Sequence, residues 1–219
     1  PSSAASDVYK RQIHAYNCAK SAQLDIPILV ATDDQAIADV VNDNGGSTLI
    51  TSKKHESGSD RIFEALEKFD PYQKYQNVIH LQGDLPNISG NLIKKLATFI
   101  NEPTREILTV VVKANPDEYN DNSIVKAAIA FSKDNPDIND IGRAMYFSRA
   151  CIPFGDTNIW HHVGIYAWKK KILKQFISLK PSPLEKSEKL EQLRALEAGI
   201  VIDAIITSDH PIGVDTELD

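Results

Sequence analysis

Three junctions that follow apolar runs of the chain carry aspartates. They are Ala31-Thr-Asp-Asp34, Leu81-Gln-Gly-Asp84 and Ile212-Gly-Val-Asp-Thr216. An aspartate at the end of a buried strand projects a hard oxygen ligand into a cleft, and two such carboxylates together suit Mg²⁺ with substrate phosphates. The plainer alternative is that each aspartate caps a helix or a turn. Spacing alone leaves both readings open.

A second polar constellation is His55-Glu-Ser-Gly-Ser-Asp-Arg61. Its small hydroxyl residues and Gly58 allow a ligand to approach the backbone closely, and an Asp/Arg pair follows at the expected start of a helix. The alternative is an N-capped helix that starts at Asp60 and leaves Arg61 in solvent. The residues by themselves favour neither.

The elements that must position these residues alternate between helical and β-branched stretches from Ile13 onward, which is typical of an α/β fold. We expect a mostly parallel sheet with helices on both faces and a small antiparallel insertion that contains the strands 106–113 and 123–131. Ligands bind such sheets beyond the carboxyl ends of the strands. The expected strands are 27–32, 47–51, 77–81, 106–113, 123–131, 144–148, 162–168 and 200–206, and the expected helices are 13–22, 35–42, 60–69, 89–100, 169–179 and 188–198.

Composition excludes several classes of protein. The chain has 219 residues, 42% hydrophobic and 25% charged, so it contains enough apolar residues for a folded core. Its net charge of −6, with dispersed basic residues, argues against nucleic acid or a membrane surface as a partner. We expect a cytoplasmic protein. Cys18 and Cys151 have no metal-ligand spacing, and we expect both to be buried thiols.

The polar motifs then fall into a known order. Val30-Ala-Thr-Asp-Asp34, Ser57-Gly-Ser-Asp-Arg61, Leu81-Gln-Gly-Asp84, Tyr146-Phe-Ser-Arg-Ala150, His162-Val-Gly-Ile-Tyr166, Leu190-Glu-Gln-Leu-Arg-Ala-Leu-Glu197 and Gly213-Val-Asp-Thr216 together resemble the 3-deoxy-manno-octulosonate (Kdo) cytidylyltransferases. The resemblance extends from Ile13 to Asp219. Any one block is a weak signal, but the ordered set is specific.

The resemblance implies a Rossmann-like nucleotidyltransferase domain that transfers CMP from CTP to Kdo for lipopolysaccharide biosynthesis, releases pyrophosphate and requires Mg²⁺. It also leads us to expect a homodimer. Asp84 and Asp215 match the metal-binding, catalytic acids of the family, and both were already singled out at the strand ends. The positions that match the nucleotide site are Ser57, Gly58, Arg61 and Gln82.

Kdo is a carboxylate sugar, so its pocket needs a cation and hydrogen-bond donors. The matching positions are Arg149, His162, Tyr166, Glu191 and Gln192. A planar guanidinium suits a carboxylate. His162 and Tyr166 lie four apart on one expected strand and should face the same side, with His161 on the other. Alone, His162 and Tyr166 would be read as a strand histidine bonded to a carbonyl and a core aromatic residue.

The ends of the chain depart from the family pattern. Family members begin with a strand and a Gly-Lys-Pro loop that holds the triphosphate, whereas residues 1–12 show no such loop and no helical or strand period. We therefore expect a linker or foreign segment at 1–12 and one domain at 13–219, an impaired fragment cut at both ends. Leu85 stands where many members have Glu. A non-catalytic nucleotide- or sugar-acid-binding relative, and a cytidylyltransferase for 8-amino-Kdo or sialic acid, remain alternatives.

Overall fold

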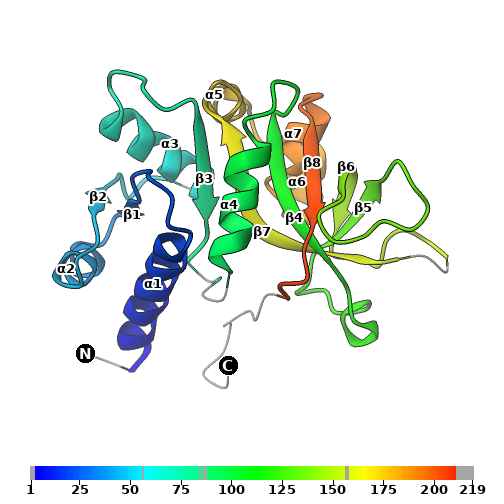
Figure 1. Ribbon diagram of the computed structural model, residues 1–219, viewed down its shortest axis with the longest axis horizontal. Coiled ribbons are helices and arrows are strands. Elements are labelled where there is room, and N and C mark those ends of the chain that lie inside the picture. Colours follow the sequence, from blue (N-terminus) through cyan, green and yellow to red (C-terminus); the bar gives the residue numbers. More distant parts are fainter. Residues whose placement is uncertain (1–2, 56, 84, 86–87, 156–157, 211–219) are drawn as a thin grey trace. The chain divides into compact units, whose positions relative to one another are not determined.

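The computed structural model of the protein describes residues 3–55, 57–83, 85, 88–155 and 158–210 (Figure 1). The chain divides into two compact units. Within the described residues, the first unit holds the chain up to Gln76 and then His80–Lys95, and the second holds Asn77–Ile79 and Leu96–His210. Strand β3 (Asn77–Leu81) and helix α4 (Gly90–Phe99) contribute residues to both.

The first unit begins with α1 (Ser3–Ser21), β1 (Val30–Thr32), α2 (Gln35–Asp43), β2 (Thr48–Ile50) and α3 (Gly58–Phe69). The two short strands pair in parallel. Asp34 caps α2, because its side chain accepts a hydrogen bond from the Ala36 N–H at 2.8 Å. The capping alternative is therefore correct for this aspartate. Parallel pairing places the carboxyl ends of β1 and β2 at one edge of their small sheet.

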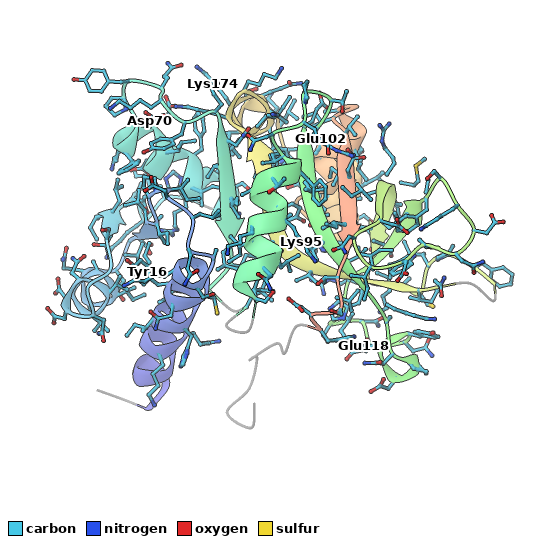
Figure 2. All side chains as sticks on the ribbon, in the orientation of Figure 1. Tyr16, Asp70, Lys95, Glu102, Glu118 and Lys174 are labelled. Atoms are coloured by element: carbon cyan, nitrogen blue, oxygen red, sulfur yellow. The ribbon has the colours of Figure 1, made fainter. Side chains whose placement is uncertain are left out.

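Helix α1 is longer than the predicted helix 13–22, since residues 3–12 are helical although their sequence shows no helical period. The Tyr16 hydroxyl lies 3.4 Å from the Gly45 carbonyl oxygen at the end of α2, and Figure 2 marks Tyr16 on α1. Ser21 and Ala22 lie so close to Gly90 that a Cβ there would approach their backbone atoms to 2.6 Å. These contacts come from Tyr16, Ser21 and Ala22, in the part of the chain that the sequence predicted as helix 13–22. The origin of residues 1–12 stays a prediction.

The second unit is built on a six-stranded sheet in the order β3-β7-β4-β8-β6-β5. Its central strands β4 and β8 are buried almost throughout and form the core with β7. The elements of this unit are β4 (Ile107–Lys113), η1 (Pro116–Glu118), β5 (Lys126–Ala130), β6 (Ile141–Ser148), β7 (Trp160–Lys169), α5 (Lys170–Ser178), α6 (Pro183–Glu188), α7 (Leu193–Glu197) and β8 (Ile202–Ile206).

The α/β class is as predicted, but this sheet is mixed rather than mostly parallel. Strands β4 and β8 pair in parallel, whereas β4–β7, β6–β8 and β5–β6 are antiparallel. The sequence prediction placed β4 and β5 together in an antiparallel excursion, but β4 lies between β7 and β8. The alternation of helical and β-branched stretches predicts where strands lie. It does not predict which strands pair, because pairing depends on contacts between residues distant in sequence.

Two smaller expectations also differ from the structure. Of the predicted helix 188–198, only Leu193–Glu197 forms a helix of its own, as α7. A separate helix that was not predicted, α6, ends at Glu188, because Lys189 adopts a left-handed backbone with φ of 57°. Cys151 is exposed and Cys18 half-buried, so neither is the fully buried thiol we expected. Among the described helices, every one is too short or too polar to cross a lipid bilayer.

Candidate active site

The guanidinium of Arg61 joins the ends of the two short strands in the first unit. Its Nη1 donates to Thr51 Oγ1 at 2.8 Å and lies 3.2 Å from Asp33 Oδ1. Asp33 follows β1 and Thr51 follows β2, so both stand at the carboxyl edge of the parallel pair. Arg61 is about a quarter exposed and is therefore a positioned cation rather than the solvated residue of the plainer reading.

Ser57 and Gly58 form the start of α3, two residues earlier than predicted. The Ser57 hydroxyl accepts from the Asp60 N–H at 3.2 Å and donates to Asp60 Oδ2 at 2.9 Å. A Cβ at position 58 would lie 3.1 Å from His80 Cε1, so glycine permits the helix to approach β3. Burial lowers the pKa of His80 to about 4, which keeps this histidine neutral at physiological pH. The ligand roles of Ser57 and Gly58 remain predictions.

Gln82 leads out of β3 into a turn in which its carbonyl oxygen accepts from the Leu85 N–H at 3.3 Å. The side chain of Gln12, on α1, lies against Gly83 where a Cβ would be. Gln12 was missed, because the sequence reading assigned it to a linker. The predicted metal ligands Asp84 and Asp215 lie outside the described residues, so their role stays a prediction.

In the second unit, His162 and Tyr166 face the same side of β7, as the alternation predicted. Their ring centroids are 5.5 Å apart. The register against β4 jumps by two residues of β7 between Val163 and Tyr166, an even number that preserves the alternation of faces. On β4, Thr109 Oγ1 lies 2.9 Å from His162 Nε2. Thr109 stands within an apolar run of the sequence, and nothing in that run predicted this contact.

Burial sets the protonation of both residues. It lowers the pKa of His162 to about 3, so the imidazole is neutral. Burial also raises the pKa of Tyr166, and the negative charge of Glu191 adds to the shift, so the phenol keeps its proton. The pair therefore offers neutral hydrogen-bonding groups in a desolvated place.

Glu191 and Gln192 lie in the turn between α6 and α7 rather than inside one helix. Besides burial, the negative charge of Glu191 contributes to the raised pKa of Tyr166. Gln192 is buried beside it in the chain. Arg194 stacks over Phe176 with its guanidinium 4.9 Å from the ring centroid. The structure thus brings His162 and Tyr166 together on β7, within the electrostatic influence of Glu191.

Arg149 is held by a neighbouring loop. Its Nη1 donates to the carbonyl oxygens of Asn122 and Ser123 at 3.0 and 3.1 Å. Lys126, fully buried, donates to the carbonyl oxygens of Ile124 and Arg149, both at 3.0 Å, and burial lowers its pKa. A lysine inside an apolar strand was a sequence signal that we did not use. The structure fixes where Arg149 stands without testing its predicted contact with a sugar carboxylate.

Comparison with known proteins gives this arrangement a family. A model of the cytidylyltransferase family matches residues 9–204. A 3-deoxy-manno-octulosonate cytidylyltransferase of Rhodopseudomonas palustris (strain BisB18) is 43% identical over 94% of this chain and 82% of its own length. The chain belongs to this cytidylyltransferase family. A relative of the same name from Brucella anthropi is 40% identical over 94% of this chain and 82% of its own length.

The structural comparison agrees. A solved structure of CMP:2-keto-3-deoxy-manno-octonic acid synthetase in complex with CTP superposes with a TM-score of 0.84 and 30% identity, covering 95% of this chain and 83% of the other. The predicted family is therefore confirmed, and the chain is a nucleotidyltransferase by membership of the cytidylyltransferases. The match of the family model begins at residue 9, inside α1.

Proposed function

We propose that this cytidylyltransferase transfers CMP from CTP to Kdo, giving CMP-Kdo and pyrophosphate in lipopolysaccharide biosynthesis. The observation that carries the proposal is the 43% identity over 94% of the chain to a relative of that activity. The CTP complex of a protein with the same fold supports CTP as the nucleotide. In this reaction the anomeric hydroxyl oxygen bonds to the α-phosphorus, the bond to pyrophosphate breaks, and the hydroxyl proton leaves.

On the nucleotide side, the chain contributes charge and backbone donors. Arg61 is held at the strand edge by Asp33 and Thr51, so its cation is oriented before a phosphate arrives. Helix α3 begins at Gly58 with Ser57 as its N-cap, and the partial positive charge of a helix N-terminus favours an anion. We assign Ser57, Gly58, Arg61 and Gln82 to nucleotide binding on this basis.

Asp84 and Asp215 are the residues that we expect to hold Mg²⁺. Carboxylates are the hard oxygen donors that Mg²⁺ prefers, so this donor set fits the ion. When bound, the ion supplies positive charge that offsets phosphate repulsion and favours the deprotonated form of a bound hydroxyl.

On the sugar side, the chain offers neutral groups. The imidazole of His162 and the phenol of Tyr166 are buried and uncharged, so they suit sugar hydroxyls rather than phosphates. Glu191 and Gln192 add a carboxylate and an amide near this pair, and Arg149 adds a cation for the sugar carboxylate. Orientation of the attacking hydroxyl by such groups contributes to the rate by positioning.

We also propose a homodimer. Met145 on β6 and Phe154 are large apolar side chains, of which Met145 is 61% exposed and Phe154 is fully exposed. Met145 lines a groove with residues of β5 and the loop after it, including Ala128, Ile129 and Phe131. A second copy of the chain would cover this surface. Cytoplasmic location remains part of the proposal.

The test of the function is pyrophosphate release from CTP in the presence of Mg²⁺, with and without Kdo. We expect release that depends on Kdo, and a loss of about 100-fold or more in kcat for Asp84→Asn and for Asp215→Asn. Asp25→Asn, at an exposed position, is the matched control. Binding of CTP without turnover would favour the non-catalytic alternative, and faster turnover of 8-amino-Kdo or sialic acid would change the assigned substrate.

A further inference from the structure

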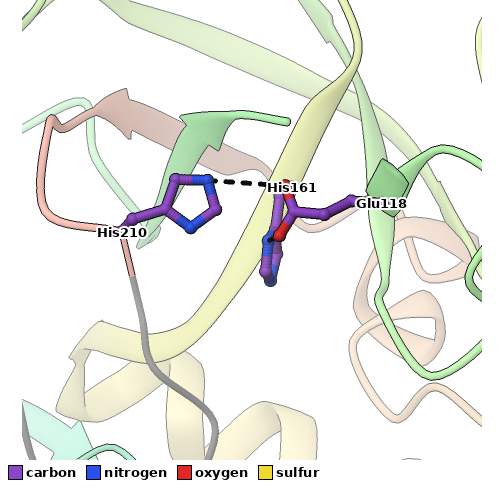
Figure 3. A group of neighbouring side chains, drawn as sticks. All are labelled: Glu118, His161 and His210. Atoms are coloured by element: carbon purple, nitrogen blue, oxygen red, sulfur yellow. Dashed lines mark hydrogen bonds and ion pairs between the residues drawn. The ribbon is translucent and has the colours of Figure 1, made fainter. Parts of the chain in front are cut away.

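Three segments of the second unit meet at one end of the neighbouring strands β7, β4 and β8. Glu118, in η1, follows the carboxyl end of β4, and His210 follows the carboxyl end of the parallel neighbour β8. His161 lies near the amino end of β7, which is antiparallel to β4, so it reaches the same end. Figure 3 shows both imidazole rings turned toward the Glu118 carboxylate.

The donor atoms are close together. His161 Nδ1 lies 2.9 Å from Glu118 Oε1, and His210 Nε2 lies 3.4 Å from Glu118 Oε2. One ligand atom from each of the three residues lies within 4.8 Å of the others, and all three are half-buried. Donors around tetrahedral zinc are about 3.4 Å apart, given bonds of about 2.0–2.1 Å. The cluster therefore needs only small side-chain movements to surround an ion.

The carboxylate is held in place by the backbone. Glu118 Oε2 accepts from the Asn115 N–H at 2.6 Å, so the rotamer that faces the two histidines is fixed locally. The side-chain amide of Asn115 lies 3.4 Å from His210 Nε2 and provides a further polar neighbour. Ligating carboxylates of metal sites are commonly supported by such hydrogen bonds.

We propose that Glu118, His161 and His210 form a site for a divalent transition metal ion of the zinc type. Two imidazoles and one carboxylate suit Zn²⁺, Co²⁺ or Ni²⁺, whereas Mg²⁺ prefers oxygen donors alone. Among the described residues, this is the one group of three such side chains with the required spacing. Three protein ligands leave a coordination position for water.

The proposed metal site lies on the other face of β7 from the proposed substrate residue His162. Successive side chains of β7 point to opposite faces, so His161 lies on the other side of the strand from His162. A bound ion would tie together the ends of β4, β7 and β8. It would therefore stabilise the folded second unit, by an amount that grows with the logarithm of the ion concentration above Kd.

The test is Zn²⁺ binding to the full chain, freed of metal with a chelator and carrying no affinity tag. Isothermal titration should give one equivalent of Zn²⁺, bound in the presence of excess Mg²⁺, and Co²⁺ should show the visible absorption of a low-symmetry site. Saturating Zn²⁺ should raise the melting temperature by about 5 °C. His210→Ala, His161→Ala and Glu118→Gln should each weaken binding by about 100-fold or more.

Two controls separate this site from adventitious binding. His55 contacts Glu64 without a second histidine, so His55→Ala removes a similar pair and should leave Zn²⁺ binding unchanged. Cys151→Ser removes the exposed thiol and should also leave it unchanged. Circular dichroism without metal shows whether each variant folds. His210→Ala is the variant that should disturb the fold least, because 35% of the His210 side chain is exposed, against 13% for His161 and for Glu118. Zn²⁺ binding that survives both histidine substitutions, or no binding by the original chain, would overturn the proposal.

Discussion

The two regions assigned to substrates are built in opposite ways. In the first unit, Arg61 is partly exposed, charged, and held by Asp33 and Thr51 at the ends of strands only three residues long. In the second unit, His162 and Tyr166 are buried and neutral on a strand of ten residues. A charged group can be positioned at a loop because it stays partly hydrated, whereas neutral groups buried without water need a sheet to align them.

The cores of the two units also differ, in the size of the apolar side chains that they bury. The second unit buries β4 and β8 with Ile, Leu and Val side chains. In the first unit many of the buried apolar residues are alanines, among them Ala15, Ala22, Ala38 and Ala65. Alanine removes little apolar surface from water, so each close contact in the first unit contributes a larger share of its stability. This contrast leads to predictions for both function and folding.

The largest expected effect is at Arg61. Arg61→Gln removes the cation while keeping a polar side chain, and we expect kcat/KM for CTP to fall by about 100-fold because one preorganised charged donor is lost. The KM for Kdo should change little. Steady-state kinetics with each substrate varied in turn measures both values.

Thr51→Ala is the matched control for Arg61. It removes a neutral partner of Arg61 and leaves the cation, so its effect on CTP should be much smaller. Equal losses in the two variants would mean that Arg61 acts through the structure of the strand edge and not through charge.

The second prediction concerns the sugar side. His162→Gln keeps a hydrogen-bonding group near Thr109 and removes the imidazole. We expect the KM for Kdo to rise about 10-fold, equivalent to about 1.4 kcal/mol, with the KM for CTP nearly unchanged. Tyr166→Phe, which removes only the hydroxyl, should act on the same substrate. If either variant raised the KM for both substrates equally, the assignment of one region to CTP and the other to Kdo would be wrong.

Much of this division was visible in the sequence. The run Asn77–Leu81 became β3 with the same bounds, and the spacing of His162 and Tyr166 correctly placed both on one face. Asp34 caps α2 through a hydrogen bond from the Ala36 N–H, only two residues away in the chain. Such features depend on local periodicity and on short-range hydrogen bonds, which a sequence displays directly.

The features that the sequence did not reveal depend on distant partners. The pairing of β4 with β7 and β8, the contact of Thr109 with His162, and the meeting of Glu118 with His161 and His210 join residues remote in sequence. Only the first part of α1, residues 3–12, was not predicted as a helix, because these residues show no apolar stripe in the sequence.

The third prediction tests how strongly the first unit depends on one close contact. Gly90→Ala would place a Cβ 2.6 Å from backbone atoms of Ser21 and Ala22, and backbone cannot yield as a side-chain tip can. We expect a loss of about 2 kcal/mol in the free energy of unfolding, measured by urea denaturation. Asn91→Ala, at the exposed next position of α4, is the control and should be nearly neutral. An unaffected Gly90→Ala would show that α1 does not pack there.

The last prediction concerns the pH dependence of stability contributed by His80 in the first unit. Burial lowers its folded pKa to about 4 from an ordinary value near 6.5. Between these values the unfolded chain binds a proton that the folded chain does not, so stability falls as pH drops, by up to about 1.4 kcal/mol per pH unit. Above about pH 6.5 the contribution of His80 to this slope vanishes.

Urea midpoints at pH 7, 6 and 5 measure the dependence of stability on pH. His80→Gln, which cannot titrate, should remove the contribution of His80 from the slope. An unchanged slope in this variant would mean that His80 is hydrated in the folded state, and that the first unit is less tightly packed around Gly58 than its geometry indicates.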